Sequence, residues 1–233
     1  MGIKQSGVDK KYGKYVMCNK RNVAIKKIME DLKCGKTRAY EIYNALNHGF
    51  ETLKDNMEIN PLTRPEEAVL LLSDIHLGKI TPTYNIEVAC ERLQQIKYSA
   101  LNIISILKRT YNIPKLHIPL LGDITDGEGI FPGQAYESTD IMTQLFTFGE
   151  YLIDIIKDIA STIEVEIIGV PGNHGRVGKH NSKKINWDTV LYKHMKEVLK
   201  KSVKQFDIAD NFYITKEING TKHLFVHGSH NIR

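Results

Sequence analysis

Four short apolar runs in this chain each end abruptly at a carboxylate, an amide or an imidazole. The runs are LLLSDIH, PLLGDITD, GVPGNH and LFVHG, and their polar residues are Asp74, His76, Asp123, Asn173, His174 and His227. Continuous apolar runs of this length are typical of strands buried on both faces of a parallel sheet. Such strands place their carboxyl ends around the crevice in which α/β proteins bind ligands. The pattern therefore predicts an α/β fold with a polar site at the strand ends.

Strand and helix patterns alternate along most of the chain. Strands are expected over 68–72, 116–121 and 165–170, and amphipathic helices over 87–111, 138–159 and 187–201. Near the C-terminus, residues 212–215 and 221–226 read as a hairpin around the turn Asn219-Gly220. The order of elements favours a layered α/β domain.

The first 60 residues differ from the rest in charge. They hold 12 Lys and Arg against 7 Asp and Glu, whereas residues 61–233 hold 20 of each class. Two apolar periodicities around the turn Cys34-Gly35 predict two short helices that resemble a helix-turn-helix. We therefore expect a basic helical segment over 1–60, a linker over 61–66 and the main domain over 67–233.

The second of these helices would be the one that reads DNA. The residues at its start that would face phosphates and base edges are Lys36, Thr37, Arg38 and Tyr40. A small α-hairpin packed on a larger domain would give the same periodicity, so both interpretations stay open.

Cysteine usage and hydropathy indicate the compartment. Cys18, Cys34 and Cys90 are widely spaced and include no CxxC pair, which argues against a disulfide framework or a zinc-thiolate site. No apolar run approaches the roughly 20 residues that a membrane-spanning helix needs. We expect a cytoplasmic protein without a membrane partner.

The polar residues at the run ends suit metal binding. Asp74 and His76 are two residues apart, so on an extended strand both side chains leave from one face and can converge on one ion. Asp123 can bridge two ions because a carboxylate has two oxygens.

Asn173 and His227 offer an oxygen and a nitrogen to a second ion, and His174 is placed to protonate a leaving oxygen. Two ions about 3.5–4 Å apart can clamp a phosphate and lower the pKa of a water molecule. The residue types predict a metal-dependent hydrolase.

The order of the motifs resembles the calcineurin-like metallophosphoesterase family, whose pattern is D-x-H, G-D-x-x-D, G-N-H-D/E, a lone H before G, and G-H-x-H. The matching segments here are Asp74–His76, Gly122–Asp126, Gly172–His174 and His227-Gly228. The resemblance covers about residues 67–233. It implies a sandwich of two β-sheets flanked by helices.

The resemblance also implies roles for single residues. Asp74, His76 and Asp123 would bind one metal ion, and Asp123, Asn173 and His227 the other. His174 would be the general acid, and Asp126 a carboxylate that orients it. Nitrogen and oxygen ligands without sulfur suit two divalent ions, with manganese as our first expectation and zinc, iron or magnesium as alternatives.

Two departures from the family pattern affect these expectations. Gly175 stands where an acidic residue usually follows the motif histidine, so another group, with Asp126 the candidate, must hold His174. No G-H-x-H follows His227, and His230 is a weak substitute ligand. We therefore expect a domain truncated at its C-terminus, with a weakened metal site.

A basic loop follows the histidine expected to act as the acid. Arg176, Lys179 and Lys183 could hold a polyanionic substrate next to a phosphoester site. An ordinary solvated loop would have the same composition.

The function that we expect is a phosphodiesterase or nuclease acting on DNA through two metal ions. SDIHLGK resembles the first motif of the DNA repair exonuclease branch, and GNHGR resembles phage and bacterial members of the superfamily. One alternative is a phosphomonoesterase for a phosphoprotein or a small phosphate ester. Another is a non-catalytic DNA-binding protein with a degraded phosphoesterase domain.

Overall fold

The computed structural model describes residues 65–134, 139–178 and 185–228. The expected helix-turn-helix, with Lys36, Thr37, Arg38 and Tyr40, lies outside these ranges, as do Lys179 and Lys183. Their assigned roles stay predictions.

A parallel four-stranded sheet forms the centre of the domain. Its strands are β1 (Pro65–Val69), β2 (Asn112–Leu120), β3 (Glu164–Gly169) and β4 (Gln205–Ile208), in the order β1-β2-β3-β4. Each strand pairs in parallel with the next one along the chain. Parallel neighbours need long crossover connections, and helices fill these connections here.

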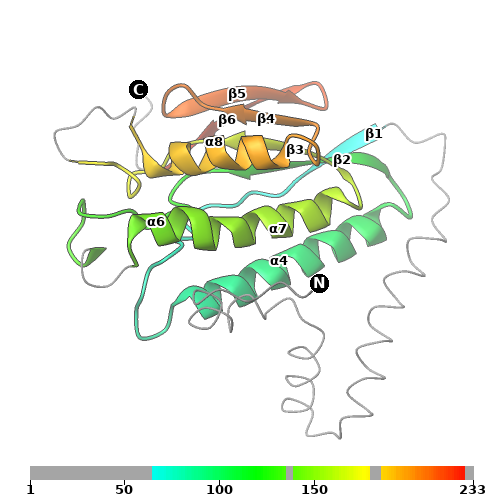
Figure 1. Ribbon diagram of the computed structural model, residues 1–233. Coiled ribbons are helices and arrows are strands. Elements are labelled where there is room, and N and C mark those ends of the chain that lie inside the picture. The colour runs from blue at the N-terminus through cyan, green and yellow to red at the C-terminus, as the bar shows by residue number, and fades with distance from the viewer. Residues whose placement is uncertain (1–64, 135–138, 179–184, 229–233) are drawn as a thin grey trace, which may run out of the picture. The chain divides into compact units, whose positions relative to one another are not determined.

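Three long helices are α4 (Ile86–Leu107), α7 (Gly149–Ala160) and α8 (Trp187–Leu199). The short α6 (Ile141–Thr143) and the π-helical turn η2 (Gln144–Phe148) lead into α7. Figure 1 shows α4, α7 and α8 together on one side of the sheet. Within the described residues, no helix combines the length and apolar character required to cross a bilayer.

A two-stranded antiparallel sheet, β5 (Tyr213–Ile218) and β6 (Thr221–Val226), lies on the other side (Figure 1). Its turn residues Asn219 and Gly220 have φ values of 48° and 76°. Positive φ at both central residues is the requirement of a two-residue turn that matches strand twist, which asparagine and glycine tolerate well. The expected hairpin is confirmed.

Successive side chains of β3 face two different layers of the core. Ile168 and the following Val170 pack with Ile218 and Phe225 of the hairpin. In the opposite direction, Gly169 lies against the ring of the fully buried Tyr192 of α8. Successive side chains of a strand point to opposite faces, so β3 packs on both the second sheet and the helices.

These observations confirm the expected α/β architecture of two sheets with flanking helices. Three details of the prediction were wrong. The structure adds β4, it ends β1 at Val69 rather than at residue 72, and it replaces one continuous helix over 138–159 by α6, η2 and α7. The expected truncation at the C-terminus stays a prediction.

A charged network also joins the two sheets. Glu166 of β3, which is nearly buried, lies 2.6 Å from Lys115 Nζ of β2 and 3.1 Å from Lys216 Nζ of β5. Lys216 also contacts Asp207 of β4 at 2.8 Å. Burial alone would raise the pKa of Glu166, but the hydrogen bonds from the two lysines outweigh it and lower the pKa.

Replacing Glu166 by glutamine should lower the free energy of unfolding by about 1–3 kcal/mol at pH 7, because two partly buried ammonium groups lose their shared partner. The folded-state pKa of Glu166 lies below its ordinary value of 4.5. The stabilisation that ionised Glu166 gives to the folded state is therefore complete above pH 4.5 and is lost as the pH falls through the folded-state pKa. In urea unfolding, the Glu166→Gln variant should therefore lose less stability on acidification than the unmodified protein does.

Glu164→Gln is the matched control, because Glu164 lies on the same strand, is more exposed, and stands 3.8 Å from Lys115. It should change stability by less than about 0.5 kcal/mol. Equal losses in the two variants would contradict a special role for the Glu166 pairs.

Candidate metal centre

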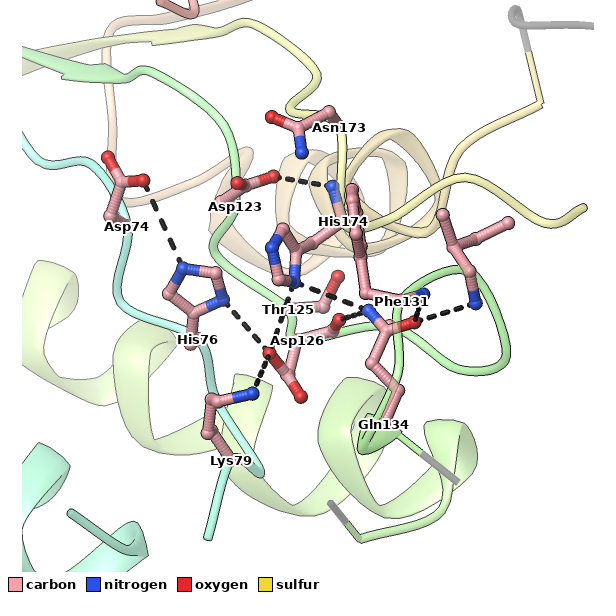
Figure 2. Close-up of polar contacts among 12 residues, drawn as sticks. Asp74, His76, Lys79, Asp123, Thr125, Asp126, Phe131, Gln134, Asn173 and His174 are labelled. Atoms are coloured by element: carbon pink, nitrogen blue, oxygen red, sulfur yellow. Dashed lines mark hydrogen bonds and ion pairs between the residues drawn. The ribbon is translucent and has the colours of Figure 1, made fainter. Parts of the chain in front are cut away.

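The polar motif residues meet at the carboxyl ends of the strands. Asp74 and His76 follow β1, Asp123 follows β2, Asn173 and His174 follow β3, and His227 follows β6. Figure 2 shows side chains from the first three of these loops pointing into one region. The structure thus brings these six residues together, whereas His230, named as a weak substitute ligand, lies outside the described residues.

The backbone at this site is locally strained. Asp74, His76 and Asp123 have φ values of 54°, 48° and 50°, in the left-handed region that residues with a Cβ rarely adopt. Such conformations cost about 1–3 kcal/mol each and concentrate at functional sites. The expectation that Asp74 and His76 share a face of an extended strand is wrong, because both lie beyond β1 in left-handed conformation.

Two loops approach each other unusually closely here. A Cβ on Gly122 would lie 2.4 Å from the Gly172 nitrogen, and a Cβ on Gly172 would lie 2.0 Å from Asp123 Oδ1. Only glycine at both positions permits this contact. The contact places Asp123 beside the segment that carries Asn173 and His174.

Asp123, Asn173 and His227 form the most tightly connected group. His227 Nε2 lies 2.8 Å from Asn173 Oδ1 and 3.3 Å from Asp123 Oδ2. The other ring nitrogen, Nδ1, donates to the carbonyl oxygen of Leu121 at 2.7 Å. Histidine ligands of metals commonly donate one N–H in this way, which orients the second nitrogen toward the ion.

Charge and hydrogen bonding shift the pKa values of this pair apart. The hydrogen bond to Asp123 raises the pKa of His227 to about 9, against the opposing effect of burial. Burial alone would raise the pKa of Asp123, but hydrogen bonds from His227 and from the His174 backbone N–H lower it. In the protein without metal, a protonated imidazole therefore lies beside a carboxylate.

Asp74 and His76 approach this group from the β1 side. His76 Nε2 lies 3.9 Å from Asp74 Oδ1, while His76 Nδ1 contacts Asp126 Oδ1 at 3.0 Å (Figure 2). Asp74 is the most exposed of these groups, with 59% of its side chain accessible.

Donor atoms of the site also fall into two compact sets. Within each set all donor atoms lie within 4.8 Å of one another; the sets are Asp74, Asp123 and His227, and His76, Asp126 and His174. The grouping differs from the expected one, since Asp74 lies with His227 rather than with His76. Oxygen and imidazole donors at this spacing fit a divalent cation.

The Asp126 carboxylate is completely buried and contacts three side chains. Its Oδ1 lies 3.0 Å from His76 Nδ1, 3.3 Å from His174 Nδ1 and 3.7 Å from Lys79 Nζ (Figure 2). Burial by itself would lower the pKa of His174, but the contacts with Asp126 and the charge of Asp123 raise it. A raised pKa keeps the imidazole protonated, which is the form that a general acid needs.

The loop after Asp126 covers His174 and was missed by the sequence analysis. The Phe131 ring stacks on His174 with ring centroids 4.3 Å apart, and the Arg176 guanidinium lies 5.9 Å from the centre of the same ring. Gln134 accepts hydrogen bonds from the Ile130 and Phe131 N–H groups, and its amide nitrogen lies 3.3 Å from His174 Nδ1. The segment matched no motif, so only its position in the fold identifies it.

Two other histidines lie apart from the site. His117 is buried in β2 with Nε2 2.9 Å from Glu67, whereas its Nδ1 has no hydrogen-bond partner within the described parts of the chain. His194 lies on α8, and its Nε2 contacts Glu150 at 2.7 Å.

Comparison with known proteins gives a limited match. No family model matches the chain. Over 63 residues, the chain is 38% identical to the DNA polymerase II small subunit from two strains of Halobacterium salinarum. The aligned segment covers 26% of this chain and 11% of each relative, so the chain spans about a tenth of the relatives it matches.

The His227 pKa gives a direct test of the site geometry. In protein freed of metal by a chelator, the imidazole of His227 should titrate at about 9, and Asp123→Asn should return its pKa toward the ordinary 6.5. NMR of the ring C–H signals measures both values. Since the folded-state pKa is raised, the stabilisation from this pair is complete below pH 6.5 and is lost as the pH rises through about 9.

His223, whose Nδ1 lies 2.9 Å from the Thr221 carbonyl oxygen, is the control, and its ring C–H signals should keep their positions in the Asp123→Asn variant. An ordinary pKa for His227 in the unmodified protein would contradict the described pairing.

Proposed function

We propose that this protein is a metal-dependent phosphoesterase of the metallophosphoesterase superfamily, and that it cleaves phosphodiester bonds in DNA. The observation that carries the proposal is the meeting of Asp123, Asn173 and His227, with His227 Nε2 directed at both oxygens. A cation that displaced the Nε2 proton would have this nitrogen and the two oxygens as ligands.

Two sets of residues would hold the metals. By the family resemblance, Asp74 and His76 would bind one ion, Asn173 and His227 the other, and Asp123 would contact both. The donor atoms of Asp74, Asp123 and His227 lie within 4.8 Å of one another, and His76 Nε2 lies 3.9 Å from Asp74 Oδ1. Asp126 and the Leu121 carbonyl support this assignment, because each accepts from one ring nitrogen of a histidine and leaves the other nitrogen for a metal. When bound, divalent ions supply positive charge for the phosphate oxygens and acidify a water nucleophile.

His174 would donate a proton from Nε2 to the leaving oxygen. Its Nδ1 contacts Asp126 and Phe131 stacks on the ring face, so the imidazole is held by contacts in which Nε2 forms no hydrogen bond. The carboxylate that orients the imidazole also stabilises its charged form. This division of roles is that of a general acid and its supporting carboxylate.

DNA is the substrate that two observations favour. The curated relatives that share the 63-residue segment are named as subunits of a DNA polymerase. Arg176, whose Nε donates to the Asn173 carbonyl, places a cation next to the candidate ligands and can contact a phosphate of a polyanion. We propose that Lys179, Lys183 and the basic N-terminal residues extend this contact.

The purified chain should hydrolyse a phosphodiester, and cleave labelled single- or double-stranded DNA, when Mn²⁺ is added. His174→Ala should lower kcat by about 10²- to 10⁴-fold, because the leaving oxygen loses its proton donor. Mn²⁺ binding, measured by calorimetry, should stay close to that of the unmodified protein.

His194→Ala is the control, because it also removes a half-buried imidazole but outside the site. It should retain activity. Faster turnover of a phosphomonoester than of a diester would favour the phosphomonoesterase alternative. Mn²⁺ binding or salt-sensitive DNA binding with no hydrolysis of any ester would favour the non-catalytic alternative.

A further inference from the structure

Asp188, the second residue of α8, connects the two loops that carry the candidate ligands. Its Oδ2 accepts the backbone N–H groups of Asp123 at 2.9 Å and Gly172 at 3.0 Å. Its Oδ1 accepts the backbone N–H of Thr125 at 2.9 Å and the Thr125 hydroxyl at 3.0 Å. The carboxylate therefore receives four hydrogen bonds from segments 16 to 65 residues away in the sequence.

This carboxylate is completely buried. Among the described residues, no lysine, arginine or histidine forms an ion pair with it. Burial and the nearby Asp123 charge raise its pKa, while the backbone N–H groups and the positive end of the α8 dipole favour its charged form. A buried carboxylate is unfavourable unless its oxygens are hydrogen-bonded, and here each oxygen accepts two bonds. Its position is therefore tightly specified.

The adjacent residues complete the same connection. Asn186, the N-cap of α8, donates from Nδ2 to the Gly172 carbonyl at 2.8 Å and accepts from the Asp188 N–H at 2.8 Å. A Cβ at Gly175 would lie 2.5 Å from Asn186 Oδ1. The glycine after His174 thus leaves the space that Asn186 occupies.

We propose that Asp188 is a positioning residue that sets the spacing between Asp123 and Asn173. Asp123 is itself a donor to Asp188, and Asn173 directly follows the second donor, Gly172. The two groups reach His227 from different loops, so their separation depends on what holds those loops together. The interpretation of the metal measurements below rests on the function proposed above.

The chemistry of an amide makes Asp188→Asn a sharp probe. Both carboxylate oxygens accept from backbone N–H groups, so either orientation of an asparagine amide directs an NH₂ group at one or two N–H donors. The variant keeps the side-chain volume and removes two acceptor positions. The loops should separate slightly without loss of the core.

Asp140→Asn is the matched control. Asp140 also accepts a threonine N–H and hydroxyl at the start of a helix, those of Thr143, but it is exposed and contacts neither loop of the site. Asparagine is as good an N-cap as aspartate, so this variant should behave like the unmodified protein.

The experiment combines amide hydrogen exchange with Mn²⁺ titration. In Asp188→Asn, either the Asp123 and Gly172 amides or the Thr125 amide should exchange about tenfold faster relative to the Ile167 amide in β3, because the NH₂ group replaces the oxygen that one of these two sets bonds to. The Mn²⁺ affinity should fall about 10- to 100-fold, as expected for loss of a group that orients ligands.

The outcomes separate the inference from the proposed function. Unchanged exchange of the three amides with unchanged Mn²⁺ affinity overturns the inference, as does equal acceleration of these amides and of Ile167, which reports global destabilisation alone. An unmodified protein that neither binds Mn²⁺ nor hydrolyses esters overturns the proposed function, while the exchange data still decide whether Asp188 positions the loops.

If Asp188→Asn does not fold, Thr125→Val replaces it, because this change removes only the hydroxyl bond to Asp188. It should weaken Mn²⁺ binding about threefold, in line with the loss of one hydrogen bond. An unchanged affinity in that variant overturns the inference.

Discussion

The contact between the loops after β2 and β3 is the constraint on which the site depends. Gly122 and Gly172 approach so closely that neither position could carry a Cβ, and the buried Asp188 carboxylate bonds to both loops. Without this contact Asp123 and Asn173 would not reach the same imidazole. The first turn of α8 thus joins the two loops through Asp188.

A second constraint is the shared use of Asp126. This buried carboxylate contacts His76, a candidate ligand, and His174, the candidate acid. The two imidazoles are also in edge-to-face contact, with centroids 4.5 Å apart. One carboxylate therefore contacts a candidate ligand and the candidate acid together, so a displacement of either imidazole should affect the position of the other. Phe131 stacks on the face of the His174 ring, and the Gln134 amide nitrogen lies 3.3 Å from the same Nδ1 that faces Asp126.

The elements that the sequence predicted best are those with long apolar runs. β2 and β3 are buried along most of their length, and the Asn219-Gly220 turn directly encodes its own positive φ values. β4 was missed because it is only four residues long and only Phe206 in it is buried. The break before α7 was missed because Gln144, at the π-helical turn, bonds to the distant Gly127 backbone.

The sequence by itself determined the kinds of elements, their order and the identity of the polar residues at the strand ends, because apolar periodicity and motif spacing are local properties. Only the tertiary structure decided which nitrogen of His227 faces Asn173 and Asp123, that Asp74 and His76 lie in left-handed conformation, and that Asp188 joins the loops. These features depend on contacts between residues far apart in the chain, which no local pattern encodes.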